Sequence, residues 1–193
     1  MLSIQIIDSR IPNYAALVAA LPGSDLTLTV GEYDNLEQSV RRFAGAIGSA
    51  AAPMNLYIAA HGRSGHLRLG ADPGLGVANA TVLAPMRGLV TGFPGGIKIW
   101  GCNVGSAAIA SRNIVDGAVG TLDSGWASGE TNLRSGAGFL LLQAIARVVG
   151  VPVTAAINEQ WVQSAWRFLG PTITVEPFGS YRLGGLRESS ATP

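Results

Sequence analysis

Apolar and polar residues alternate along this chain in two different rhythms. Six short segments are rich in β-branched or aromatic residues and bounded by turn-forming residues, which predicts strands over residues 3–7, 26–30, 55–60, 97–100, 153–157 and 173–175. Three longer segments place apolar residues on one face of a helix, which predicts helices over residues 13–20, 35–47 and 135–149. The alternation of strand and helix predicts an α/β fold, a three-layer sandwich around a mostly parallel sheet of roughly six strands.

Local signals refine this outline. Asn35 is a suitable helix cap, and Glu37 lies four residues before Arg41, a spacing that pairs charges on a helix surface. Between the third and fourth strands, the sequence predicts a small hairpin over residues 63–70, a loop over 71–80 and a helix over 81–90. Pro85 weakens the prediction of this helix unless it lies in the first turn. Residues 106–129 are predicted to form a partly ordered loop or a short helix. We expect one domain over residues 1–183 and a flexible tail over residues 184–193.

Composition narrows the class of protein. The chain has 193 residues, of which 13% are charged, and a net charge of +1, so no excess of cations predicts binding to nucleic acid or to an anionic membrane. No apolar run reaches the ~18 residues of a spanning helix, and the N-terminus lacks the pattern of a signal peptide, which makes a cytoplasmic location the default expectation. With one Cys and two His, we expect no internal disulfide and no metal site, and the motif of a phosphate loop is absent, so no cofactor is predicted.

The candidate chemistry follows the third and fourth predicted strands. The third strand runs directly into His61, and the fourth ends two residues before Cys102, the only cysteine in the chain. A parallel sheet delivers functional side chains at the C-terminal ends of its strands. If the two strands are neighbours, the imidazole and the thiol emerge side by side, which is the arrangement of a cysteine nucleophile with a histidine base.

Two motifs carry these residues: Ile58-Ala-Ala-His-Gly62 and Trp100-Gly-Cys-Asn-Val-Gly105. Together they resemble the caspase-fold cysteine peptidases, a group that includes caspases, metacaspases, gingipains and separase and that carries His-Gly after the third strand and the nucleophilic Cys after the fourth. The chain is most similar to a bacterial caspase-like domain near the start of large repeat-rich surface proteins, which implies a secreted or cell-surface protein. The similarity covers roughly residues 54–175, and further matching positions are His61–Gly70, Gly138–Ala156 and Trp166.

The resemblance implies a role for each residue at the predicted site. Cys102 resembles the nucleophile and His61 the general base, while the backbone N–H groups of Gly62 and Cys102 resemble the oxyanion hole. These roles agree with the chemistry, because a thiolate is a far better nucleophile than a thiol and a glycine lets the backbone approach a substrate closely.

One position departs from the family pattern. Caspases and metacaspases place Gln or Asp two residues before the cysteine, where it helps to form the pocket for the residue before the scissile bond, whereas this chain has Trp100. Substrate-pocket candidates are therefore Trp100 itself, Asp8 after the first strand and Glu159 after the fifth. Two carboxylates at such a pocket would favour Arg or Lys in the substrate.

Plainer interpretations remain for most of these residues. A lone cysteine after a buried strand, such as Cys102, is commonly a small core residue. Asp8 could cap the turn before the first helix, and Glu159 could be a solvated loop carboxylate. His66 fits a hairpin residue better than a second base, and Asn103 could orient the loop without joining the chemistry.

Two functions of different classes follow. The first is a cysteine endopeptidase that forms an acyl-enzyme on Cys102 and acts on a peptide or protein substrate, by self-processing or by limited proteolysis of partner proteins. The second is a non-catalytic caspase-like module that uses the cleft at the strand edge for binding or structure, an alternative that Trp100 in the pocket position keeps open.

Overall fold

The computed structural model describes residues 3–20, 26–48, 55–92, 95–102, 104–105, 136–157, 168 and 171–184. A seven-stranded sheet runs through this part of the chain in the order β10-β9-β8-β7-β3-β1-β2. Its strands are β1 (Ser3–Asp8), β2 (Leu26–Val30), β3 (Asn55–Ala59), β7 (Ile97–Trp100), β8 (Val153–Ala156), β9 (Thr172–Val175) and β10 (Tyr181–Gly184). β2, β1, β3, β7 and β8 are parallel, and β9 and β10 each run antiparallel to the strand before them. The predicted α/β fold with a mostly parallel sheet is therefore confirmed.

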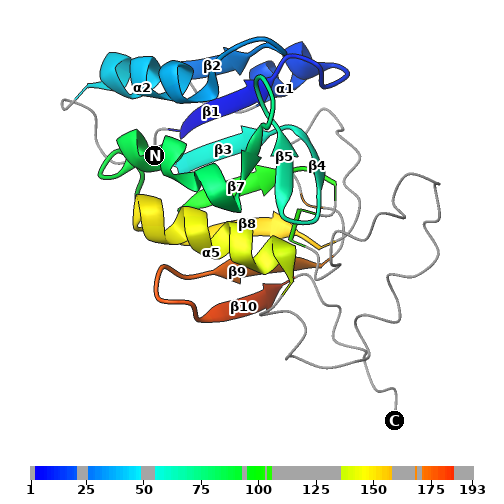
Figure 1. Ribbon diagram of the computed structural model, residues 1–193, viewed down its shortest axis with the longest axis vertical. Helices are drawn as coiled ribbons and strands as arrows, with labels where there is room; N and C mark the ends of the chain where they lie inside the picture. Colours follow the sequence, from blue (N-terminus) through cyan, green and yellow to red (C-terminus); the bar gives the residue numbers. More distant parts are fainter. Residues whose placement is uncertain are drawn as a thin grey trace.

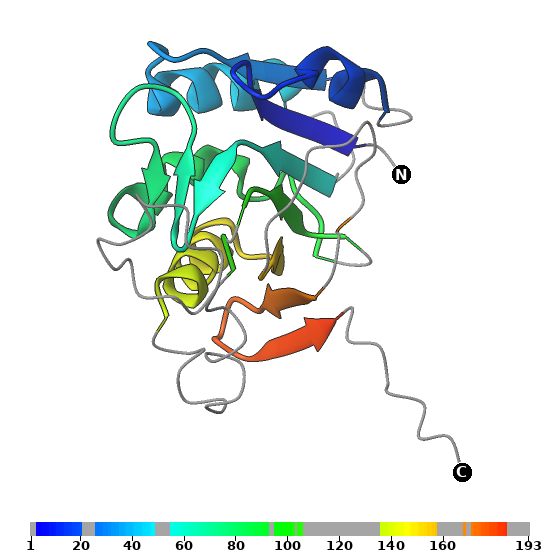
Figure 2. The same ribbon diagram turned by 90° about the vertical axis from the view of Figure 1, so that its right-hand side faces the viewer.

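Helices cover both faces of this sheet (Figures 1 and 2). α1 (Tyr14–Ala20) packs on one face, against a small cluster that contains Ile7 and Trp100. α2 (Leu36–Ile47), the 3₁₀ helix η1 (Val77–Met86) and α5 (Ala137–Val149) pack on the other face, where they form a large buried cluster with the sheet. α1 and α2 lie on opposite faces because the chain crosses from β1 outward to β2 and then back past β1 to β3, and each crossover is right-handed.

The strand order reverses beside β1, and this reversal matters for the site. β1 pairs with β2 on one side and with β3 on the other, so the loops after β1 and after β3 leave the sheet in opposite directions. In an open α/β sheet the crevice outside the carboxyl ends of two such strands is the usual place for a ligand.

Local interactions of side chains and backbone define where the helices begin and end. The Asn35 side chain accepts a hydrogen bond from the Gln38 N–H at 2.9 Å, which confirms the predicted cap of α2, and Glu37 pairs with Arg41 at 2.8 Å as the spacing predicts. α5 ends at Gly150, whose φ of 87° is the left-handed conformation that glycine adopts without strain.

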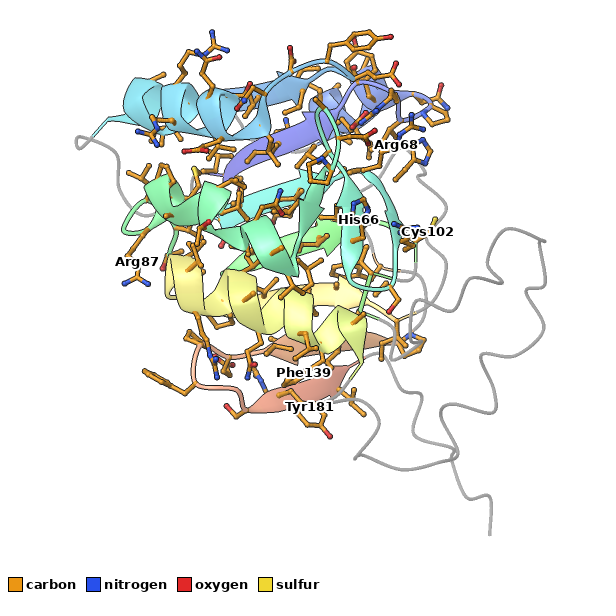
Figure 3. The ribbon with its side chains drawn as sticks, viewed as in Figure 1. His66, Arg68, Arg87, Cys102, Phe139 and Tyr181 are labelled. Carbon is orange, nitrogen blue, oxygen red and sulfur yellow. The ribbon has the colours of Figure 1, made fainter. Side chains whose placement is uncertain are left out.

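The last turn of α5 is also held from η1. The Arg87 guanidinium donates to the carbonyl oxygens of Val148 at 2.8 Å and Arg147 at 2.6 Å, which satisfies acceptors at the helix end. At its other end α5 packs on β10, where the rings of Phe139 and Tyr181 meet edge to face at 5.9 Å (Figure 3).

A second, three-stranded antiparallel sheet follows β3. It consists of β4 (His61–Arg63), β5 (His66–Arg68) and β6 (Leu75–Gly76), in the order β4-β5-β6. β4 and β5 are the predicted hairpin. Leu67 and Leu75 on β5 and β6 are fully buried, so this small sheet is packed into the main core.

Three expectations differ from the structure. Residues 71–80, predicted as loop, contain β6 and the start of η1, which begins at Val77 instead of residue 81 and holds Pro85 near its end. The sheet has a seventh strand, β10, which includes Gly184, the first residue of the predicted tail. The rest of that predicted tail, residues 185–193, and the predicted loop or short helix over 106–129 lie outside the described residues. No helix within the described ranges combines the length and apolar character that crossing a membrane requires.

Candidate active site

Three neighbouring strands of the main sheet end at the same edge. β1, β3 and β7 are adjacent and parallel, with Ile7 opposite Ala59 and Ala59 opposite Trp100. The residues that follow them therefore start from the same edge of the sheet: the turn after β1, then His61, then Cys102. Figure 3 shows Cys102 at the end of the molecule toward which β3 and β7 point, the same end as Arg68 on β5. The predicted adjacency of the two strands is confirmed.

His61 is the exposed first residue of β4 and reaches the turn after β1. Its Nε2 atom lies 3.4 Å from the carbonyl oxygen of Arg10. With the proton on Nε2 the ring donates to that oxygen, and Nδ1 is left as the basic nitrogen. A separation of 3.4 Å between these two atoms is longer than the roughly 2.7–3.2 Å of most N–H···O hydrogen bonds.

Gly62 brings β4 into contact with the turn that carries Cys102. A Cβ atom added to Gly62 would lie 2.5 Å from Cγ2 of Val104, 3.1 Å from the carbonyl oxygen of Cys102 and 3.2 Å from its nitrogen. The first of these distances is shorter than packed carbon atoms tolerate. Only glycine allows this approach, so the residue next to His61 lies directly against the backbone of Cys102.

The Cys102 turn is held in place by backbone hydrogen bonds from three directions. These bonds are Ala60 N–H to Trp100 O (3.1 Å), Gly65 N–H to Val104 O (3.3 Å) and Gly105 N–H to Ala156 O (2.9 Å). The Cys102 residue itself is half-buried, so it is not sealed in the core. The turn is therefore anchored to the main sheet on one side and to the β4–β5 hairpin on the other.

Asp8 ends β1 with a fully buried side chain that is already paired. Its Oδ1 accepts hydrogen bonds from the backbone N–H and from Nε of Arg10, both at 2.8 Å, and its Oδ2 accepts one from a terminal guanidinium nitrogen. The hydrogen bond with Asp8 is the main cause of a raised pKa of Arg10. The contact with the Arg10 N–H is the turn-capping role considered for Asp8, and no part of the carboxylate is exposed to receive a substrate side chain.

Trp100, the second pocket candidate, is also buried. Its ring stacks on Phe168 at 4.3 Å between centroids and on Tyr57 at 5.6 Å. The stack lies on the α1 face of the sheet, where it packs against Ile7 and Ala59. The third pocket candidate, Glu159, and also Asn103 lie outside the described residues.

His66 is the first residue of β5 and lies opposite Arg63 at the turn of the hairpin. Its Nε2 lies 2.5 Å from the carbonyl oxygen of Pro73, so the ring is engaged with the loop that leads to β6. Across the residues that the structure describes, no three His, Cys, Asp or Glu side chains gather closely enough to hold a metal ion.

The residue that the sequence did not single out is Arg10. Its carbonyl oxygen faces the His61 ring, and its guanidinium donates to the carbonyl oxygens of Arg68 and Gly70, each at 3.2 Å. The one available signal was the Asp-Ser-Arg spacing directly after a predicted strand. It suggests a local ion pair and gives no indication of contacts more than 50 positions away.

Comparison with known proteins adds no assignment to this geometry. A scan of protein-family models, a search of curated proteins and a search of solved structures each returned no significant match.

Proposed function

We propose that this chain is a caspase-like cysteine peptidase in which Cys102 is the nucleophile and His61 the general base. The observation that carries the proposal is the contact between the segment His61–Gly62 and the backbone of Cys102, at the ends of two adjacent parallel strands. Acyl transfer needs a nucleophile, a basic nitrogen and backbone donors around one carbonyl carbon. The proposal assigns these parts to Cys102, His61 and the backbone of Gly62 with that of Cys102.

His61 is suited to the base because of its contact with Arg10. A ring that donates from Nε2 to a backbone carbonyl is held in one tautomer, and its basic Nδ1 is then available to a thiol. A backbone carbonyl serves here as the orienting acceptor, a part that a carboxylate plays in other nucleophile–base systems.

The backbone of Gly62 is suited to stabilise an oxyanion. Arg63 and His66 face each other across a two-residue turn, so Gly62 and Leu67 form the next, non-hydrogen-bonded pair of the ladder. The Gly62 N–H therefore points away from β5, at the outer edge of β4. With the N–H of Cys102 it could donate to a developing oxyanion, and a donor of this kind typically lowers the barrier by roughly 3–4 kcal/mol.

The reaction that follows has balanced proton transfers. Nδ1 of His61 takes the thiol proton, the Cys102 sulfur attacks the scissile carbonyl carbon, and the oxyanion accepts hydrogen bonds from the two backbone N–H groups. Collapse breaks the C–N bond, and the imidazolium gives its proton to the leaving amine. Water, deprotonated by the same imidazole, then hydrolyses the thioester and regenerates the thiol.

The caspase-like assignment rests on the order of the motifs in the sheet. His-Gly follows the third strand of the parallel sheet with one residue between, and Gly-Cys follows the fourth strand directly, which is the order in the family that the sequence resembles. The helix α5 and the strand β8 then follow in the order that the similarity implies.

The test uses thiol-directed peptide probes, such as acyloxymethyl ketones with varied side chains. We expect one or more probes to label the wild-type protein at Cys102, with no labelling of Cys102→Ala and labelling reduced at least about a hundredfold in His61→Ala, the lower range for loss of a general base. The matched control is His66→Ala, which removes the chain's other imidazole from the same hairpin and should keep labelling near wild type.

Each outcome of the labelling experiment has one interpretation. Labelling that is unchanged in His61→Ala rejects the dyad. A thiol that reacts with no peptide probe faster than an ordinary cysteine does would favour the non-catalytic module, in which the buried Trp100 stack is structural and the strand edge binds without cleaving.

A further inference from the structure

Arg10 contacts the β4–β5 hairpin that carries His61 in two ways. Its carbonyl oxygen lies 3.4 Å from the ring Nε2, and its guanidinium donates to the carbonyl oxygen of Arg68 at 3.2 Å. Arg68 is the residue directly opposite His61 in the β4–β5 ladder. One residue therefore holds both the imidazole and the strand that pairs with the backbone of His61.

Asp8 fixes Arg10 in the conformation that makes both contacts possible. Its carboxylate binds the backbone N–H and the guanidinium of Arg10 together, so the position of the Arg10 backbone is coupled to that of its side chain. Asp8 is fully buried at the last position of β1 and is paired with Val30 of β2, so the main sheet holds the carboxylate itself. A bidentate pair between arginine and carboxylate is the most geometrically defined ion pair available in proteins.

The other charges near Arg10 are weaker constraints. Glu32 lies 3.8 Å from the guanidinium and also binds Arg68 at 3.1 Å, but its side chain is about half exposed. Asp72 acts on Arg10 only at longer range. Neither makes the two-oxygen contact that Asp8 makes.

We propose that Asp8 and Arg10 form a positioning clamp, which fixes the tautomer of His61 and the place of its ring beside Cys102. This inference rests on the proposed peptidase function and assigns Asp8 a role other than substrate binding. Any Arg10 substitution keeps the backbone carbonyl oxygen, so a change in the behaviour of His61 reports on the side-chain clamp that holds that oxygen in place.

The variants separate the clamp from charge in general. Asp8→Asn keeps the size and one acceptor oxygen but loses the charge, and Arg10→Lys keeps the charge but cannot reach Asp8, Arg68 and Gly70 together. The matched control is Arg68→Ala, which removes an exposed charge from the same hairpin but keeps the carbonyl oxygen that Arg10 binds.

The first measurement is the rate of Cys102 alkylation by iodoacetamide as a function of pH, on the full chain, with folding checked by circular dichroism. We expect Asp8→Asn and Arg10→Lys to lower the alkylation rate at neutral pH about tenfold, because the imidazole is no longer held where it can take the thiol proton. Arg68→Ala should stay within about twofold of wild type.

The second measurement is the ¹⁵N imidazole spectrum, which distinguishes the two tautomers of neutral histidine. The chain has only two histidines, so His66→Ala assigns both signals. We expect wild-type His61 to carry its proton on Nε2 and both clamp variants to show a mixture of tautomers. A folded Asp8→Asn or Arg10→Lys protein that keeps the wild-type tautomer and the wild-type alkylation profile overturns the clamp.

The two proposals fail in different ways. If wild type alkylates like an ordinary thiol and His61→Ala changes nothing, the peptidase proposal fails, while the tautomer spectrum still decides whether Asp8 and Arg10 orient the ring. If Asp8→Asn does not fold, Arg10→Lys carries the test, because the buried carboxylate keeps a cationic partner in that variant.

Discussion

The hairpin that carries His61 and the turn that carries Cys102 meet at one sheet edge but are held in different ways. The His61 side depends on polar side chains: the buried Asp8, its partly buried partner Arg10, and the half-exposed Glu32 beyond them. The Cys102 side depends on the absence of side chains, because Gly62 and Gly101 lie where any Cβ would meet a neighbour at 2.5 to 2.7 Å. The first side should therefore be sensitive to charge and the second to volume.

This difference follows from where each segment leaves the sheet. The turn after β1 lies at the reversal of strand order, where the loops diverge, and side chains must span the distance between them. The turn after β7 lies between two parallel neighbours and under the hairpin, so backbone packs on backbone. The first place suits groups that must adjust to a ligand, and the second suits the rigid placement that the proposed nucleophile needs.

The largest effect on stability should come from Asp8→Ala. It leaves the Arg10 guanidinium without its carboxylate in a mostly buried place, and breaking such a pair by removing one partner typically costs about 3–5 kcal/mol. Urea unfolding followed by circular dichroism measures this loss. The control is Glu37→Ala, which breaks an exposed pair on α2 and should cost no more than about 0.5 kcal/mol. Equal losses in the two variants would show that the buried pair is not special.

Gly62→Ala should lower the stability less than Asp8→Ala does, but it should clearly lower the reactivity of Cys102. The added methyl group would overlap Val104 and press on the Cys102 backbone, and overpacking of this kind costs about 1–3 kcal/mol. Because β4 must move away from the turn, alkylation of Cys102 should lose its dependence on His61, which the iodoacetamide pH profile detects.

Two further variants test whether volume is the cause. Gly45→Ala on α2 is the control, since nothing lies within 4 Å of its Cβ position, and it should stabilise the helix by about 0.5–1 kcal/mol. The double variant Gly62→Ala with Val104→Ala should recover part of the reactivity, because it removes the shortest of the overlaps. Additive losses in the double variant would count against a steric explanation.

The sequence predicted the parts of the fold that local chemistry decides. The strands with buried β-branched runs and the Asn35 cap both depend on residues a few positions apart. β10 was missed because Tyr181–Gly184 is short, partly exposed and paired only through β9, so its partner defines it as a strand. The start of η1 was missed because its apolar residues follow no helical period, and β6 is only two residues long.

The candidate site likewise has parts that neighbouring residues determine and parts that depend on distant contacts. His61, Gly62 and Cys102 were singled out as candidates because short motifs follow two strands in order, and the structure places Gly62 against the turn that carries Cys102. The contact of Arg10 with His61 joins residues 51 positions apart and depends on how the β1–α1 turn packs on the hairpin. Asp8 was noticed as a carboxylate at a strand end, but its partner could be known only from the fold.

The smallest expected effect concerns the outer layer of charge on the His61 side. Glu32 lies 3.8 Å from the Arg10 guanidinium and 3.1 Å from that of Arg68, with 46% of its own side chain exposed. Exposed pairs of this kind contribute about 0–1 kcal/mol, because water screens them and ordering two long side chains costs entropy.

Glu32→Gln should therefore destabilise the protein by less than about 1 kcal/mol, and the difference from wild type should vanish near 1 M NaCl, where the screening length is about 3 Å. Urea unfolding at low and high salt measures both quantities, with Glu176→Gln, which loses a comparable pair with Arg182, as the matched control. A loss of several kcal/mol that persists in salt would mean that the outer charges, and not the buried Asp8 carboxylate, hold Arg10 against the His61 strand. The inner pair should resist the same salt, because a buried carboxylate is screened far less than an exposed one.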